Sequence, residues 1–269
     1  MDCKEFKINT PRFSANCIRF GKGKKTLVLI SGLNVRDVKG RMVAIGLAYA
    51  YRSFAKDYTV YVFDRREDLP DRFSLEEIAE DIADCMKELK LDHADIFGVS
   101  QGGMIAQYLA LDHPELVDKL VLGVTASRVN ETMKAFIERW CDMAKAGNIL
   151  DVMKDYFYSS YSDKYLKKYA SLIPTAIKAI HPMSAARFIT LAESCLTCDT
   201  YERLPDIHCP VLVLGGGKDK LVTIQATLEI AEKIGCEPVI YEEYGHSAYE
   251  EAPDFNQRVL SFLLNEDDK

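Results

Sequence analysis

The sequence predicts an α/β fold in which a mostly parallel central sheet carries helices on both faces and one helical segment is inserted. Three observations predict it. Strand-like and helix-like segments alternate along most of the chain. Residues 128–201 interrupt this alternation, because they contain no strand-like run. A strand, a glycine-rich turn and a helix surround Ser100.

The first half of the chain contains four short apolar runs that are typical of buried strands. These runs are residues 26–30, 58–63, 95–99 and 119–124. Helix-like segments lie between them, and they cover residues 42–55, a stretch that starts at Ser74, and residues 101–111. The second of these begins with Ser74-Leu75-Glu76-Glu77, which fits the S-x-x-E capping box of a helix N-terminus.

Residues 128–201 read as helical and rich in aromatic residues, and the strand rhythm resumes only after them. The later elements are a strand at 211–214, a helix at 223–234, a strand at 238–241 and a helix at 254–264. We therefore expect a core domain of residues 1–127 and 202–269 and a lid, or cap, of residues 128–201. The alternative is a helical elaboration without a catalytic role. Four tyrosines of the lid are expected mostly at its solvent edge: Tyr156, Tyr158, Tyr161 and Tyr165.

The composition excludes several classes of protein. A net charge of -7 without a cluster of Lys and Arg argues against nucleic-acid binding. No targeting segment and no apolar run of about 20 residues is present, so we expect a cytoplasmic protein that does not span a membrane. The 8 cysteines are expected as reduced thiols, and the lone C-x-x-C of Cys195 and Cys198 lacks the second pair of a zinc site. The sequence thus predicts no metal and no cofactor, and it indicates no particular oligomeric state.

The segment Gly98-Val99-Ser100-Gln101-Gly102 fits G-x-S-x-G in the context that this motif requires. The sharp turn between strand and helix lifts the serine hydroxyl above the sheet edge, and side chains at the two glycines would collide within the turn. The turn also puts the N–H of Gln101 at a helix N-terminus, where it can stabilise an oxyanion. The alternative is a tight turn with a solvent-facing serine.

A serine nucleophile needs a base, and only 5 histidines are available. Among them, only His246 follows a strand in a loop at the carboxyl end of the predicted sheet, where open α/β sheets place their sites. Asp219 also follows a strand, and the order Ser100, Asp219, His246 matches that of one class of triad. For His246, the alternative is a histidine in a surface loop. For Asp219, the alternative is the N-cap of the following helix, although Thr223 is the better candidate for that cap.

These motifs together resemble the α/β-hydrolase superfamily, specifically its small, lidded esterase and lactonase-like members. The resemblance covers nearly the whole chain outside the lid. It rests on the segments GVSQGG, PVLVLGGGKD, GHSAYEEAP and TLVLISGLN. In that family the first three supply the nucleophile, the acid and the base, and these roles fall on Ser100, Asp219 and His246.

The fourth segment departs from the family pattern. The family commonly has His-Gly after this strand, and the N–H of the next residue completes the oxyanion hole. Here Ser31 replaces the histidine and Leu33 is the expected donor, which leaves the hydrogen bonding of this loop open. An Arg-Gly-x-Gly turn is also common in the family, whereas this chain has Arg65 without the glycines.

The resemblance implies a serine hydrolase that cleaves small carboxylic esters by acyl transfer. Ser100 would attack, His246 would move the proton, Asp219 would orient the imidazole, and the amides of Leu33 and Gln101 would hold the oxyanion. Thioester, lactone or C–C bond hydrolysis fits the same residues. A catalytically slow ligand-binding receptor of the same fold is the alternative from another class.

Overall fold

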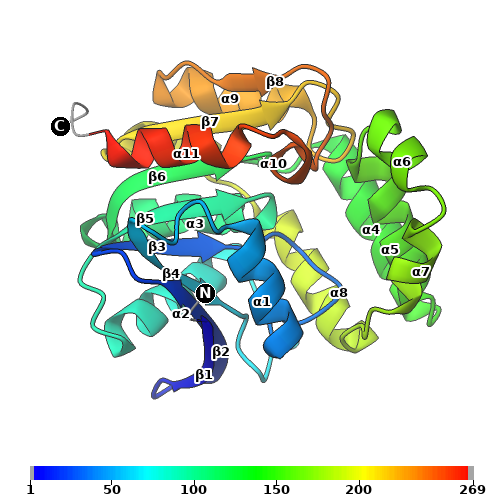
Figure 1. The fold of residues 1–269 in the computed structure, drawn as a ribbon, viewed down its shortest axis with the longest axis horizontal. Coiled ribbons are helices and arrows are strands. Elements are labelled where there is room, and N and C mark those ends of the chain that lie inside the picture. The colour runs from blue at the N-terminus through cyan, green and yellow to red at the C-terminus, as the bar shows by residue number, and fades with distance from the viewer. Residues whose placement is uncertain (1–2, 266–269) are drawn as a thin grey trace.

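The computed structural model describes residues 3–265. An eight-stranded sheet runs through the molecule in the order β1-β2-β4-β3-β5-β6-β7-β8 (Figure 1). Its strands are β1 (Cys3–Asn9), β2 (Ser14–Gly21), β3 (Lys25–Ile30), β4 (Tyr58–Phe63), β5 (Ala94–Val99), β6 (Val117–Gly123), β7 (Val211–Gly216) and β8 (Val239–Tyr241). The pairings along β4-β3-β5-β6-β7-β8 are all parallel, whereas β2 pairs antiparallel with both β4 and β1. The predicted mostly parallel sheet is therefore confirmed.

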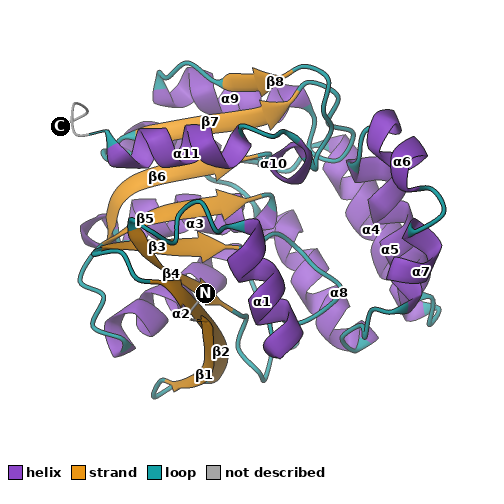
Figure 2. Cartoon of the chain, viewed as in Figure 1, coloured by secondary structure: helices purple, strands orange, loops and turns teal. Residues whose placement is uncertain are grey.

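Helices cover both faces of this sheet (Figure 2). They are α1 (Arg41–Ala50), α2 (Leu75–Glu88), α3 (Gln101–Asp112), α4 (Glu131–Lys145), α5 (Ile149–Ser160), α6 (Asp163–Tyr169), α7 (Ile173–Lys178), α8 (Ala185–Ser194), α9 (Ile224–Ile234), α10 (Ala248–Glu251) and α11 (Phe255–Leu264). Short 3-10 turns lie at Pro114–Leu116, Cys195–Thr197 and Tyr201–Asp206.

Two apolar cores form because successive strand side chains point to opposite faces of a sheet. In β3, Leu27 and Leu29 pack into the core under α1 and α11, and Val28 and Ile30 pack into the core under α2, α3 and α9. All four side chains are buried, which explains why this strand is a continuous apolar run.

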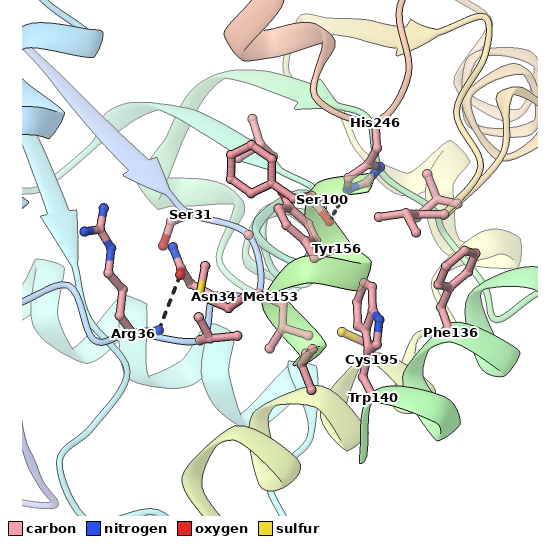
Figure 3. A pocket seen from close by; sticks show the side chains of 18 of the residues that line it. Ser31, Asn34, Arg36, Ser100, Phe136, Trp140, Met153, Tyr156, Cys195 and His246 are labelled. Atoms are coloured by element: carbon pink, nitrogen blue, oxygen red, sulfur yellow. Dashed lines mark hydrogen bonds between the residues drawn. The ribbon is translucent and has the colours of Figure 1, made fainter. Parts of the chain in front are cut away.

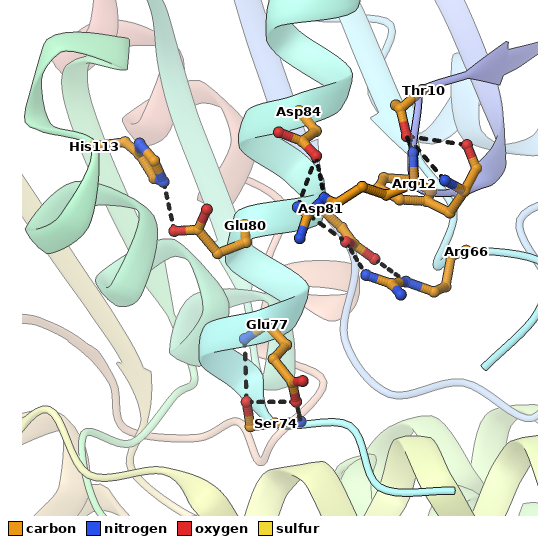
Figure 4. A network of polar contacts seen from close by, with 10 residues as sticks. Thr10, Arg12, Arg66, Ser74, Glu77, Glu80, Asp81, Asp84 and His113 are labelled. Carbon is orange, nitrogen blue, oxygen red and sulfur yellow. Dashed lines mark hydrogen bonds and ion pairs between the residues drawn. The ribbon is translucent and has the colours of Figure 1, made fainter. Parts of the chain in front are cut away.

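Helix α2 begins where the capping box predicts. The Ser74 hydroxyl accepts a hydrogen bond from the Glu77 amide, and the Glu77 carboxylate accepts one from the Ser74 amide (Figure 4). Further along the same helix, Asp81 forms an ion pair with Arg66, which lies outside the helix (Figure 4). These contacts attach α2 to the loop that follows β4.

Helices α4 to α8 lie between β6 and β7 in sequence, and α4 to α7 stand beyond the carboxyl ends of the parallel strands (Figure 1). An antiparallel bridge between Arg128 and Asp199 closes the base of this helical insertion. Helix α8 packs along α4. The insertion therefore faces the sheet edge where the loops after β3, β5, β7 and β8 meet.

Two local predictions are wrong, and two strands are missing from the prediction. The helix expected over residues 42–55 ends at Ala50, and a turn over residues 51–57 packs on β2 so closely that a side chain at Gly21 would lie 3.1 Å from Ala55 Cα. Strands β1 and β2 have no counterpart among the predicted elements. Thr223 does not cap α9 with its side chain, because its φ of 73° lies in the left-handed region.

No helix among residues 3–265 combines the length and the apolar character that crossing a membrane requires.

Candidate active site

Ser100 lies at the turn between β5 and α3, at the carboxyl end of a central strand. Its backbone is strained, with φ 54° and ψ −124°, and this conformation lifts the side chain above the sheet. A side chain at Gly98 would approach the Gly102 carbonyl to 2.4 Å, and one at Gly102 would approach the Ile30 carbonyl to 2.0 Å. The two glycines of the motif are thus required by close backbone packing.

The structure brings Ser100, His246 and Asp219 together in one chain of hydrogen bonds. His246 Nε2 lies 2.9 Å from Ser100 Oγ (Figure 3), and His246 Nδ1 lies 2.8 Å from Asp219 Oδ2. His246 comes from the loop after β8 and Asp219 from the loop after β7. His246 is only 2% exposed, so the imidazole is shielded from water on most sides.

Asp219 also holds its own loop. Its Oδ1 accepts hydrogen bonds from the amides of Leu221 at 2.8 Å and Val222 at 3.1 Å. One oxygen thus serves the backbone before α9 while the other serves His246. The carboxylate does not cap α9, because both amides precede Thr223, the residue at the N-cap position.

Leu33 and Gln101, the two residues that the sequence predicts as oxyanion donors, belong to segments next to Ser100: Leu33 lines the same cavity, and Gln101 directly follows Ser100. Gln101 is the first residue of α3, where backbone N–H groups have no partner within the helix. Gly32 sits so close that a side chain there would lie 3.1 Å from Ser100 Cβ. The loop after β3 therefore runs directly beside the nucleophile turn.

Arg65 connects these two loops, a role that the sequence does not reveal. Its Nη2 donates to the Ser31 carbonyl at 2.9 Å and to Gln101 Oε1 at 3.1 Å. The guanidinium is buried, and burial lowers the pKa of Arg65 to about 10. The loop after β3, which lacks the usual histidine, is therefore held in place by the hydrogen bond that the Ser31 carbonyl accepts from Arg65.

Gln101 extends the connection to the helical insertion. Its Nε2 donates to the Leu191 carbonyl at 2.6 Å and lies 3.3 Å from Cys195 Sγ. Burial raises the pKa of the Cys195 thiol to about 12, so this cysteine stays protonated. Among residues 3–265, no three His, Cys, Asp or Glu side chains gather as metal ligands.

A cavity of about 360 Å³ opens in front of Ser100 and His246. Figure 3 shows Phe136 and Trp140 of the insertion on one side of the cavity and Ser31, Asn34 and Arg36 of the loop after β3 on the other, with Met153 of the insertion between them. The size falls within the range of small-molecule sites, and most of the lining is apolar or aromatic.

One part of the cavity wall is polar, and the sequence does not predict it. Tyr51, Tyr156, Tyr161, Tyr249 and Glu250 all line the cavity. The expectation that the lid tyrosines lie mostly at the solvent edge is wrong for Tyr156 and Tyr161, although Tyr158 is 53% exposed. The helical periodicity of this region does not reveal which helix face meets the core.

A family model described as alpha/beta hydrolase fold matches residues 45–253. A curated relative, "Putative carbamate hydrolase RutD" of Rhizobium rhizogenes, is 24% identical over 251 residues, which cover 87% of this chain and 96% of the relative. Another, 3-oxoadipate enol-lactonase 1 of Acinetobacter baylyi, is 22% identical over 208 residues, which cover 76% of this chain and 77% of the relative.

Solved structures show the same fold. The crystal structure of the enol-lactonase from Burkholderia xenovorans LB400 superposes with a TM-score of 0.83 at 18% identity, covering 97% of this chain and 100% of that one. At this identity the likeness concerns the fold alone. Together with the family model, which spans most of the chain, these relatives show that the protein belongs to the alpha/beta hydrolase fold family and is a hydrolase.

Proposed function

We propose that this enzyme hydrolyses small carboxylic esters by acyl transfer through Ser100, with His246 as the base and Asp219 as the orienting acid. The observation that carries the proposal is the continuous hydrogen-bonded chain from Ser100 Oγ through both nitrogens of His246 to Asp219 Oδ2. A serine hydroxyl is a weak nucleophile at neutral pH, and a hydrogen-bonded imidazole held in one tautomer removes that limit.

The geometry supports a two-step reaction. His246 Nε2 takes the hydroxyl proton while Ser100 Oγ attacks the ester carbonyl carbon, and the carbonyl oxygen becomes an oxyanion. The amides of Leu33 and Gln101 donate hydrogen bonds to it. His246 then gives its proton to the leaving alcohol, which departs and leaves an acyl group on Ser100. His246 next deprotonates a water molecule, which attacks the acyl carbonyl, and the carboxylic acid leaves as the serine regains its proton.

We also propose that residues 128–201 act as a lid. Phe136, Trp140 and Met153 belong to this insertion and line the cavity in front of Ser100. Gln101, directly after the nucleophile, hydrogen-bonds the carbonyl of Leu191 in α8. A segment that both encloses the cavity and contacts the nucleophile turn can exclude water from the reaction.

The names of the relatives agree with this bond type. One relative is named for a carbamate and another for an enol-lactone. Both compounds contain an acyl carbonyl bonded to oxygen or nitrogen, and a lactone is a cyclic ester. The same attack by Ser100 would open such groups, so lactones belong in the substrate screen beside open esters.

The proposal is tested by the hydrolysis of p-nitrophenyl acetate and butyrate by the purified enzyme. We expect multiple turnovers, with the Ser100→Ala variant slower by about 10⁴-fold or more and unchanged in its circular dichroism spectrum and melting temperature. Release of at most one equivalent of product per enzyme would contradict an ester hydrolase and favour a ligand-binding role. Full activity of Ser100→Ala would exclude Ser100 as the nucleophile.

A further inference from the structure

Four tyrosines surround a glutamate in the wall of the cavity, and we call Tyr51, Tyr156, Tyr161, Tyr249 and Glu250 the acidic aromatic cluster. The Tyr161 hydroxyl donates to Glu250 Oε2, and the hydroxyls of Tyr156 and Tyr249 lie 3.4 Å apart. The cluster joins three parts of the fold, because Tyr51 follows α1, Tyr156 belongs to α5, and Tyr249 and Glu250 belong to α10.

The positive charge of Arg36 lowers the pKa of Glu250 through space, without an ion pair between the two side chains. Among residues 3–265, no Lys, Arg or His side chain forms an ion pair with it, and Arg36, which lines the same cavity, forms none either. Glu250 is nevertheless accessible to solvent that enters the cavity. An unpaired carboxylate at a cavity wall can attract a cation that arrives with a ligand.

The tyrosines remain neutral around this carboxylate. Desolvation raises the pKa of Tyr156 to about 12 and raises the pKa values of Tyr51, Tyr161 and Tyr249 as well. Desolvation also raises the pKa of Glu250, although hydrogen bonds from Tyr161 and Tyr249 and the charge of Arg36 oppose this shift. The wall therefore combines one carboxylate with several uncharged aromatic rings.

Aromatic rings beside a carboxylate are the two components with which proteins bind organic cations, because a ring face and a negative charge both attract a positive one. We propose that the acidic aromatic cluster binds a positively charged ammonium group of the substrate, so that the enzyme selects esters that carry such a group. This inference rests on the proposed ester hydrolysis, since it names the class of ester that the same cavity takes.

The placement of the cluster supports a defined orientation of the substrate. Helix α10 begins two residues after His246, so the cluster adjoins the base, and Tyr156 lines the cavity together with Ser100 and His246 (Figure 3). Phe136 and Trp140 of α4 also line the cavity and offer no charge, and the Trp140 ring meets the Tyr156 ring edge-on with centroids 6.0 Å apart. The ammonium group would therefore occupy the side of α10, and an apolar group would occupy the side of α4.

The first test measures binding without catalysis. Calorimetry with tetramethylammonium and choline would be performed on the Ser100→Ala protein and on the double variants that add Glu250→Gln or Glu243→Gln. Glu243 is an exposed residue that pairs with Lys218, so its variant removes one charge outside the cavity and serves as the matched control. We expect binding that Glu250→Gln weakens by at least about tenfold and Glu243→Gln leaves unchanged.

The outcomes of this test are distinct. Absence of binding, or equal weakening by both variants, would overturn the proposed cation site even if the enzyme hydrolyses simple esters. Gln keeps the shape of Glu250 and still accepts a hydrogen bond from Tyr161, so a specific loss in Glu250→Gln reports the charge rather than a change of fold.

The second test compares acetylcholine with 3,3-dimethylbutyl acetate, two esters of the same shape that differ in one positive charge. We expect kcat/KM to be at least about tenfold higher for acetylcholine than for the neutral ester, and we expect this ratio to fall close to one in Glu250→Gln. A ratio near one in the wild-type enzyme would overturn the inference. Cation binding without turnover of any ester would instead refute the proposed hydrolysis and leave the cation site standing.

Discussion

Asp219 shows how much one side chain carries in this site. Its two oxygens have different partners, because Oδ2 meets His246 Nδ1 and Oδ1 accepts from the amides of Leu221 and Val222. The same carboxylate therefore fixes the loop after β7 and the orientation of the imidazole. A replacement that tests the contact with His246 alone must keep the hydrogen bonds from the amides of Leu221 and Val222.

Asp219→Asn meets that condition. An asparagine carbonyl can still accept from the loop amides, but its amide nitrogen would donate toward His246 Nδ1 and stabilise the wrong tautomer. We expect kcat for an ester to fall by about 10³–10⁴-fold, with a melting temperature within a few degrees of the wild type. Steady-state kinetics and thermal unfolding check this, and retained activity would point to another acid.

Arg65 gives a second prediction for a single residue. Its guanidinium reaches the Ser31 carbonyl and the Gln101 side chain together, and the single ammonium of a lysine cannot reproduce this fork. We expect Arg65→Lys to lower kcat by about 10–100-fold with little change in KM, because the two oxyanion donors lose their common anchor. A change in KM alone, with kcat intact, would contradict this role.

Some residues of the site can be predicted from the sequence around them, and others cannot. Ser100, Asp219 and His246 can be predicted because each follows a strand, and parallel strands bring their carboxyl ends to one edge of the sheet. Glu250 and Arg65 cannot, because their roles depend on how α10 and the loop after β4 pack against distant segments. Burial of Arg65 is also contrary to the usual position of arginine at the surface.

At the scale of elements, helix α2 shows that a local sequence motif can determine where a helix begins. The capping box of Ser74 and Glu77 forms as the sequence predicts, and it lies apart from the cavity. We expect Ser74→Ala to lower the free energy of unfolding by about 1 kcal/mol without changing kcat or KM. Urea unfolding measures this, and Ser261→Ala, within α11, is the matched control that should change stability far less.

Helix α1 shows where local signals fail. The apolar composition of residues 42–55 favours a helix throughout, yet the helix ends at Ala50. Phe54 is fully buried in the turn that follows, and β4 must start at Tyr58 beside β3. Tertiary packing thus overrides the helical propensity of this stretch.

Strands β1 and β2 also lack a local sequence pattern that would predict them. They form an antiparallel pair at the sheet edge, where neither strand is a continuous apolar run.

At the scale of the whole molecule, the strand order explains where the cavity lies. The chain passes from β3 to β4 on one side and then to β5 on the other side of β3. The loops after β3 and β5 therefore diverge at a topological switch point, which is where open α/β sheets bind ligands. Leu33 lies on the first of these loops and Ser100 on the second.

Buried carboxylates at distant points of the molecule give its stability a common dependence on pH. Desolvation raises the pKa values of Asp64, Asp81 and Asp95. Between the ordinary pKa and the raised one, the folded chain holds more protons than the unfolded chain, so each of these groups makes stability fall as pH rises through that window.

Asp95→Asn tests this sign. Asparagine can still accept the hydrogen bond that the Tyr58 hydroxyl donates to Asp95 at 2.7 Å, but it carries no charge. We expect the variant to gain stability relative to the wild type as pH rises from about 4 to 7. Urea unfolding at both pH values measures the difference, and a gain that shrinks with rising pH would contradict the assignment.

The central claim is that Ser100 is a nucleophile activated by His246, and covalent labelling tests it most directly. The protein would be treated with a fluorophosphonate and the modified residue identified by mass spectrometry. We predict one label per chain at Ser100, lost after prior denaturation and strongly reduced in His246→Ala. A folded protein that remains unlabelled, or one labelled at another serine, would contradict the account.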